Sequence, residues 1–74
     1  MRAKAEKLFD IAVSLTPEET GGQDWIEDLR ADAEAGLPAW ANTLKGYMRG
    51  LWGAGVIGLE DFDDFDKALV DAGY

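Results

Sequence analysis

TLKGYMRGLWGAGVIGLEDFDDFDKALV, residues 43–70, holds two amphipathic segments and the glycines that separate them. Apolar side chains recur in both segments at the three- and four-residue steps of a helix. Gly55 suits the left-handed position that follows a helix, and Gly58 suits the N-cap of the next one. The stretch therefore predicts one helix over about 38–54 and a second over about 59–72.

The same kinds of signal extend toward the N-terminus. Gly36, Leu37 and Pro38 form a strong stop, because glycine accepts the left-handed cap and proline cannot continue a helix. Apolar residues at helical spacing before this stop predict a helix over about 24–35. A further apolar stripe predicts a helix over about 2–15.

The connection over 16–23 begins with Thr-Pro-Glu-Glu, a sequence typical of a helix start. Thr16 can accept a hydrogen bond from the amide of residue 19, and Glu19 can reach back. Gly21 and Gly22 follow at once, so we expect a loop with at most one helical turn.

Together these patterns predict an all-α fold, a compact bundle of four short helices forming a single domain over residues 1–74. A chain of 74 residues lies near the lower end of what folds alone. It has no cysteine and no histidine, which excludes disulfides, thiolate metal sites and imidazole chemistry. An apolar share of 47% nevertheless favours a packed core over disorder.

The helical spacing also predicts the placement of single side chains. We expect Trp25 and Trp40 to pack in the core, and Trp52 and Tyr74 to be more exposed. Asp66 falls nearest the apolar edge of its helix, so it is the acid expected to be partly buried or paired.

Gly46, Gly50 and Gly53 line a second face of the third predicted helix. Glycine inside a helix costs about 1 kcal/mol relative to alanine, so three of them need an offsetting contact. Close approach of a neighbouring helix within the monomer is the expected explanation. A homodimer closed through this face is the alternative.

Two local sequences resemble ligand-binding motifs but lack the required context. Residues 53–58 match the G-x-G-x-x-G nucleotide fingerprint, which needs a preceding strand inside a βαβ unit. A predicted helix precedes it here, so the sequence indicates a helix cap and a turn. Residues 61–66 suggest a calcium loop, yet Asp66 stands where an EF-hand has glycine. Weak divalent binding by Glu60 and Asp64 stays open.

We expect no enzymatic activity and no cofactor. Ser14 is the one serine, and the chain has no histidine to activate it. Glu6 and Asp10 interrupt the apolar run that a signal peptide needs, and no apolar stretch approaches the length of a membrane span. We therefore expect a cytoplasmic location.

Acidic residues are concentrated in two segments. Residues 18–34 hold seven acidic side chains against one arginine, and residues 60–71 hold six against one lysine, in a chain of net charge −8. They recur at steps of three and four residues, a rise of about 4.5–6 Å each along a helix. Such rows resemble the charge ladder of a phosphate backbone. A field of this sign favours basic partners and repels nucleic acid and anionic membranes. Solubility alone is the competing interpretation.

The candidate partner-binding residues are the outward acids of the second and fourth predicted helices, with one exposed aromatic anchor. They are Asp24, Glu27, Asp28, Glu34, Glu60, Asp63, Asp64, Asp71 and Trp52. The expected partner is a basic protein surface, with no direct contact to nucleic acid or membrane. The protein itself would be a monomer or a homodimer.

Residues 46–52 followed by 55–62 are similar to a helix, G-V-I, acidic-helix pattern in many small bacterial and phage proteins. In overall character the chain resembles the small acidic inhibitors of phages and mobile elements, of the anti-CRISPR and anti-restriction types. That resemblance implies an inhibitor that covers the basic surface of a nucleic-acid-handling protein, inside a bacterial host cell. The alternative from another class is a structural or assembly module that homodimerises through Gly46, Gly50 and Gly53.

Overall fold

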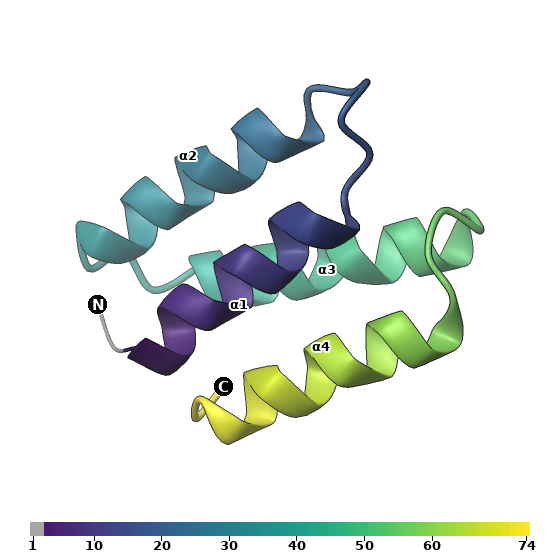
Figure 1. The fold of residues 1–74 in the computed structure, drawn as a ribbon. Coiled ribbons are helices and arrows are strands. Elements are labelled where there is room, and N and C mark those ends of the chain that lie inside the picture. The colour runs from purple at the N-terminus through teal and green to yellow at the C-terminus, as the bar shows by residue number, and fades with distance from the viewer. Residues whose placement is uncertain (1–2) are drawn as a thin grey trace.

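Four α-helices and their connections make up residues 3–74, the part of the chain that a computed structural model describes (Figure 1). The helices are α1 (Ala3–Leu15), α2 (Gly22–Glu34), α3 (Trp40–Gly53) and α4 (Leu59–Asp71). The predicted all-α fold is confirmed, and residues 3–74 contain no strand. The ends of all four helices and the start of α4 agree with their predictions to within one residue. Helix α2 begins two residues before its predicted start and α3 two residues after, and residue 2 lies outside the described part.

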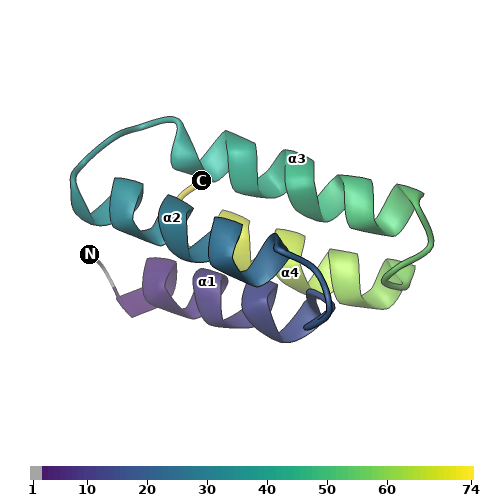
Figure 2. The ribbon, with the colours of Figure 1, turned by 90° about the horizontal axis from the view of Figure 1, so that it is seen from above.

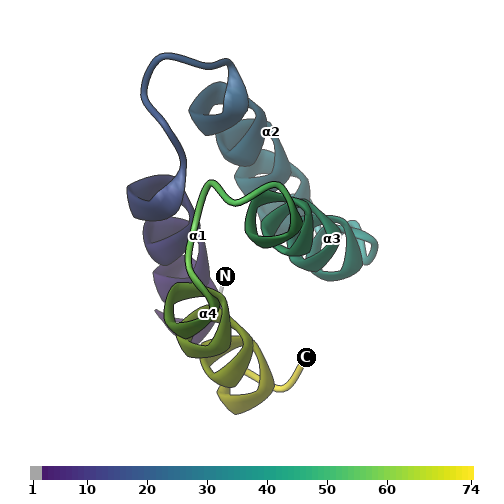
Figure 3. The same ribbon diagram turned by 90° about the vertical axis from the view of Figure 1, so that its right-hand side faces the viewer.

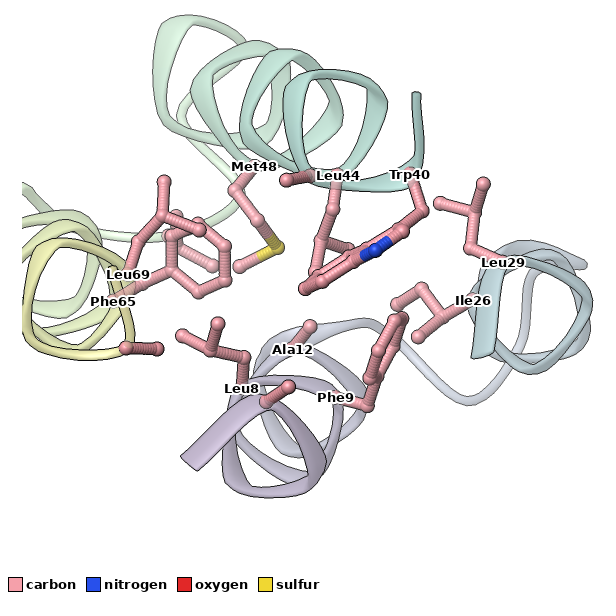
Figure 4. Close-up of a cluster of buried hydrophobic side chains, with 14 residues drawn as sticks. Leu8, Phe9, Ala12, Ile26, Leu29, Trp40, Leu44, Met48, Phe65 and Leu69 are labelled. Carbon is pink, nitrogen blue, oxygen red and sulfur yellow. The ribbon is translucent and has the colours of Figure 1, made fainter. Parts of the chain in front are cut away.

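Each helix packs against two others, so the four surround one shared core (Figures 2 and 3). Chain neighbours pack together, and α4 closes the arrangement by packing against α1. Looking down the bundle, α2 and α4 lie on opposite sides, with α1 and α3 between them (Figure 4).

The core is filled by the inner stripes of all four helices (Figure 4). Its largest fully buried side chains are Phe9, Phe65, Leu8, Ile26, Leu44 and Met48. Trp40 packs on Phe9 with ring centroids 5.0 Å apart, which confirms its predicted place in the core. These apolar contacts between helices far apart in sequence are what hold so small a domain together.

The prediction that Trp25 packs in the core is wrong. Ile26 and Leu29 occupy the inward centre of α2, and Trp25 lies at the edge of that stripe, 38% exposed. Its indole packs at a tilt against the ring of Tyr47 in α3, with centroids 4.8 Å apart and an angle of 49° between the ring planes. The large side chain therefore covers the α2–α3 seam from outside.

Three helices end in the same backbone motif, in which a left-handed glycine is followed by an apolar residue. Gly36, Gly55 and Gly73 have φ values of 80°, 77° and 95°. After α3, the amide of Gly55 donates to Trp52 O at 3.0 Å and the amide of Val56 to Leu51 O at 2.9 Å. This is the Schellman pattern, so the predicted caps at Gly36 and Gly55 are confirmed. Gly58 stands at the N-cap of α4, as predicted.

The connection between α1 and α2 differs from its prediction. Thr16 is buried, and its hydroxyl donates to the carbonyl of Ala12 at 2.8 Å in place of capping a new helix. Helix α2 begins at Gly22, two residues before its predicted start, where the Tyr47 hydroxyl and Thr16 Cγ2 leave no room for a side chain. Gln23 reaches back from α2 and donates to the carbonyls of Val13 and Thr16, both at 3.2 Å. The Val13 carbonyl also accepts from the amide of Thr16, and the bonds of Gln23 tie the start of α2 to the end of α1.

The glycine face of α3 is not packed within the molecule, contrary to expectation. A Cβ built on Gly46, Gly50 or Gly53 would meet no atom within 4 Å. The inward side of α3 is occupied by Leu44 and Met48, so these glycines point away from the bundle. Their cost in helix stability is not offset by a contact among residues 3–74.

Candidate interaction surface

The acids predicted on α2 and α4 all lie on the solvent side of their helices. The burial of Ile26 and Leu29 turns the remaining circumference of α2 outward, and the burial of Phe65 and Leu69 does the same for α4. The eight predicted acids are all exposed, namely Asp24, Glu27, Asp28 and Glu34 on α2, and Glu60, Asp63, Asp64 and Asp71 on α4, and Asp32 and Asp61 are exposed as well. The predicted exposure of these eight residues is therefore confirmed.

Ion pairs within residues 3–74 engage two of the eight. Glu27 lies 3.2 Å from Nε of Arg30, and Asp71 lies 3.1 Å from Nζ of Lys4. The other six make no ion pair with any described residue. They are Asp24, Asp28 and Glu34 on α2, and Glu60, Asp63 and Asp64 on α4.

Asp66 behaves as predicted, being half-buried and paired. Its Oδ1 lies 3.3 Å from Nζ of Lys45 on α3. The two atoms do not meet hydrogen-bond geometry, since Oδ1 is buried without a hydrogen-bond donor. The contact is thus an ion pair across the α3–α4 seam.

Arg30 is the one strongly engaged cation in the described chain. Its guanidinium donates to Glu6 at 3.1 Å and to Asp10 at 3.0 Å, both on α1, and lies 5.3 Å from the centroid of the Phe9 ring. Partial burial lowers the pKa of Arg30. The hydrogen bond with Asp10 and the charges of Glu27, Glu6 and Asp10 outweigh that effect and raise the pKa above its ordinary value. Arg30 therefore links α2 to α1, and its guanidinium is bound by acids of the same chain.

The two acidic rows do not share a surface. Because α2 and α4 lie on opposite sides of the core, their unpaired acids face away from each other (Figure 4). A single flat partner surface cannot meet both rows at once. Each row is a separate candidate contact.

Only the α4 row has the predicted aromatic anchor beside it. Trp52, in the last turn of α3, stacks on Phe62 of α4 with ring centroids 5.3 Å apart and planes 14° apart. Its indole stays 38% exposed, as predicted. Trp52 and the acids at the start of α4 thus lie at the same end of the bundle.

Two apolar residues at this end were not among the predicted site residues. Val56 is 47% exposed in the connection, and Leu59 is 53% exposed as the first residue of α4. A signal for both was present in the sequence. Val56 follows the left-handed glycine of a helix cap, and Leu59 falls outside the inward spacing of Phe62, Phe65 and Leu69.

Residues 3–74 enclose no pocket, and they bring no three potential metal-ligating side chains together. No helix in this part of the chain is long and apolar enough to cross a bilayer. Residues 53–58 form a helix end, a turn and an N-cap, in agreement with the predicted cap-and-turn interpretation.

No family model, curated protein or solved structure matches this chain.

Proposed function

We propose that this protein binds a basic surface on a partner that handles nucleic acid, and that it inhibits the partner by covering that surface. The observation that carries the proposal is the set of eight exposed acids on α2 and α4 without an ion pair among residues 3–74, which are the six named above together with Asp32 and Asp61. An uncompensated anionic row attracts Lys and Arg and competes with a phosphate backbone for them.

The distribution of ion pairs supports this proposal over solubility alone. Arg30 is held by Glu6, Asp10 and Glu27, and Lys45 is held by Asp66. These cations lie at helix seams, so the outer acids of α2 and α4 other than Glu27 and Asp71 have no cation partner among residues 3–74. Competition for a basic groove is the use that such a distribution fits best.

The test is inhibition of partner binding to nucleic acid as a function of salt. Proteins retained by the immobilised chain from a bacterial lysate would be eluted with duplex DNA and assayed for DNA binding with and without the chain. We expect the chain to reduce DNA binding at about 50 mM salt and to lose most of this effect by about 500 mM, where exposed charges are strongly screened.

Matched variants separate the effect of the acidic charges on inhibition from the effect of the fold. Glu60→Gln, Asp63→Asn and Asp64→Asn together remove three charges from α4, and Asp24→Asn, Asp28→Asn and Glu34→Gln remove three from α2. At least one triple variant should inhibit less than the wild type. Inhibition that is flat across the salt series and equal for all three proteins would refute the proposal.

A homodimer through the α3 glycine face is the second candidate, and one observation favours it. The open space around Gly46, Gly50 and Gly53 leaves the backbone of α3 accessible to another helix. Sedimentation over a concentration series would reveal a dimer, and Gly50→Leu would dissociate it. A monomer at all concentrations would exclude this candidate.

A further inference from the structure

The junction between α3 and α4 carries a cluster of exposed apolar side chains. Trp52, Val56 and Leu59 fall within eight residues and supply three of the seven large apolar side chains exposed in residues 3–74. Figure 1 shows this junction at the end of the bundle away from both chain termini. We call Trp52, Val56 and Leu59 the junction patch.

The backbone of the junction holds these side chains outward. Gly55 reverses the chain in the left-handed conformation, and the amide of Val56 is tied to Leu51 O at 2.9 Å. Ile57, the next residue, enters the core and is 7% exposed, so Val56 stays outside. The ring of Phe62 stacks on the indole of Trp52 and holds it in place. These contacts fix the positions of the three side chains of the junction patch.

Acids form a rim along one side of the junction patch. Glu60, Asp61, Asp63 and Asp64 occupy the first turns of α4, directly after Leu59, and all four are exposed. None of them makes an ion pair with a residue in 3–74. An apolar centre with a charged rim is the usual anatomy of a protein interface, and an aromatic residue at its centre is a typical hot spot.

The negative charge of the acidic rim indicates which kind of molecule can bind the junction patch. A second copy of this chain would set one acidic rim against another, and an anionic membrane or a nucleic acid would be repelled in the same way. A protein segment that carries both apolar side chains and Lys or Arg complements the apolar centre and the acidic rim together. Burial of the apolar centre provides affinity, and the rim selects for positive charge.

We infer that the junction patch is the docking surface for a helical segment of a partner protein, with apolar residues on one face flanked by Lys or Arg. This inference rests on the proposed binding to a basic partner and specifies where and how that partner is held. Of the two acidic rows, it assigns the contact to α4, because α2 exposes one large apolar side chain, Trp25, and the junction patch has three.

The experiment uses a probe of defined chemistry, a 14-residue peptide of leucine and lysine in helical periodicity. Binding to the ¹⁵N-labelled chain would be followed through backbone amides and the three indole N–H signals. A lysine–serine peptide of equal charge and a leucine–glutamate peptide of equal apolar content are the controls. We expect the leucine–lysine peptide to bind most tightly and to shift the Trp52 indole together with amides of residues 52–64.

Surface variants locate the contact without disturbing the core. Leu59→Ser should weaken binding by roughly fivefold to tenfold, the effect of losing part of a buried leucine. Leu37→Ser is the matched control, since Leu37 is 52% exposed in the other glycine-capped connection, and it should change nothing. The triple amide variant of Glu60, Asp63 and Asp64 should weaken binding more than the triple variant on α2.

The outcomes separate this inference from the proposed function. If both triple variants weaken binding equally and Leu59→Ser has no effect, the junction patch is refuted while charge-driven binding stands. If the leucine–glutamate peptide binds as tightly as the leucine–lysine peptide, or if the chain self-associates through Leu59, the assigned occupant is wrong. If salt and both triple variants leave binding unchanged, the proposed function fails as well.

Discussion

Trp52 and Phe62 stack nearly parallel across the seam between α3 and α4, with ring centroids 5.3 Å apart. The two residues flank the chain reversal at Gly55, so the stack joins the end of one helix to the beginning of the next. Phe62 is half-buried and packs against the core. The stack therefore connects the exposed junction patch to the interior.

Replacing Trp52 should lower stability as well as remove the anchor. For Trp52→Leu we expect a loss of about 1–2 kcal/mol, from the stacking contact and the apolar area covered by the indole. In a domain of this size that corresponds to a fall in Tm of about 4–16 °C. Thermal unfolding followed by circular dichroism measures it. A double-mutant cycle with Phe62→Leu should show coupling of about 0.5–1.5 kcal/mol, and additivity would contradict a direct contact.

Arg30 should contribute to stability through the carboxylates around it. Arg30→Met leaves Glu6, Asp10 and Glu27 without their shared cation, and we expect a loss of about 1–3 kcal/mol in urea unfolding. Arg30→Lys should recover only part of it, since an ammonium cannot reproduce the planar set of donors. If Arg30→Lys restored full stability, the planar arrangement of the guanidinium donors would not contribute to it.

The pH dependence of this contribution follows from the raised pKa of Arg30. A group whose pKa is higher in the folded state than in the unfolded state stabilises fully below the unfolded value, and the effect is lost as pH rises through the folded value. Both values lie far above neutrality for arginine. The difference in stability between wild type and Arg30→Met should hence stay constant from pH 7 to pH 10, and a decline over that range would contradict the assignment.

Gly53 and Gly55, two residues apart, should respond to alanine with opposite signs. Gly53 is helical and a Cβ there meets nothing within 4 Å, so Gly53→Ala should stabilise by about 0.5–1 kcal/mol. Gly55 has φ of 77°, so Gly55→Ala should destabilise by about 1–2 kcal/mol. Urea unfolding of the two variants, each serving as the other's control, provides the measurement. Equal signs would show that the backbone at this helix end is not as described.

The sequence predicted the helices well where local chemistry decides them. The stop at Gly36 and the cap at Gly55 depend on the backbone freedom of glycine, which is a property of the residue itself. Thr16 shows the limit of such reasoning. Its hydroxyl had a plausible local partner as a cap, but burial against the core turned it toward Ala12 instead.

The candidate site was predictable in its parts and not in its arrangement. Helical spacing alone places Asp24 and Asp63 on solvent faces, because the apolar stripe beside each must turn inward. That the two lie on opposite sides of the molecule follows from the packing of α2 and α4, which sequence spacing does not encode. The junction patch likewise appears only when the end of α3 and the start of α4 are seen together.

The sequence by itself determined four amphipathic helices, their glycine caps and the outward position of the acids, since each depends on residue type and spacing along a few turns. Only the tertiary structure decided that Arg30 pairs with Glu6 and Asp10 of α1, that Trp25 lies outside the core, and that the glycine face of α3 is open. These features depend on contacts between residues far apart in the chain. Such contacts are fixed by how the apolar stripes pack together, and no single stripe contains that information.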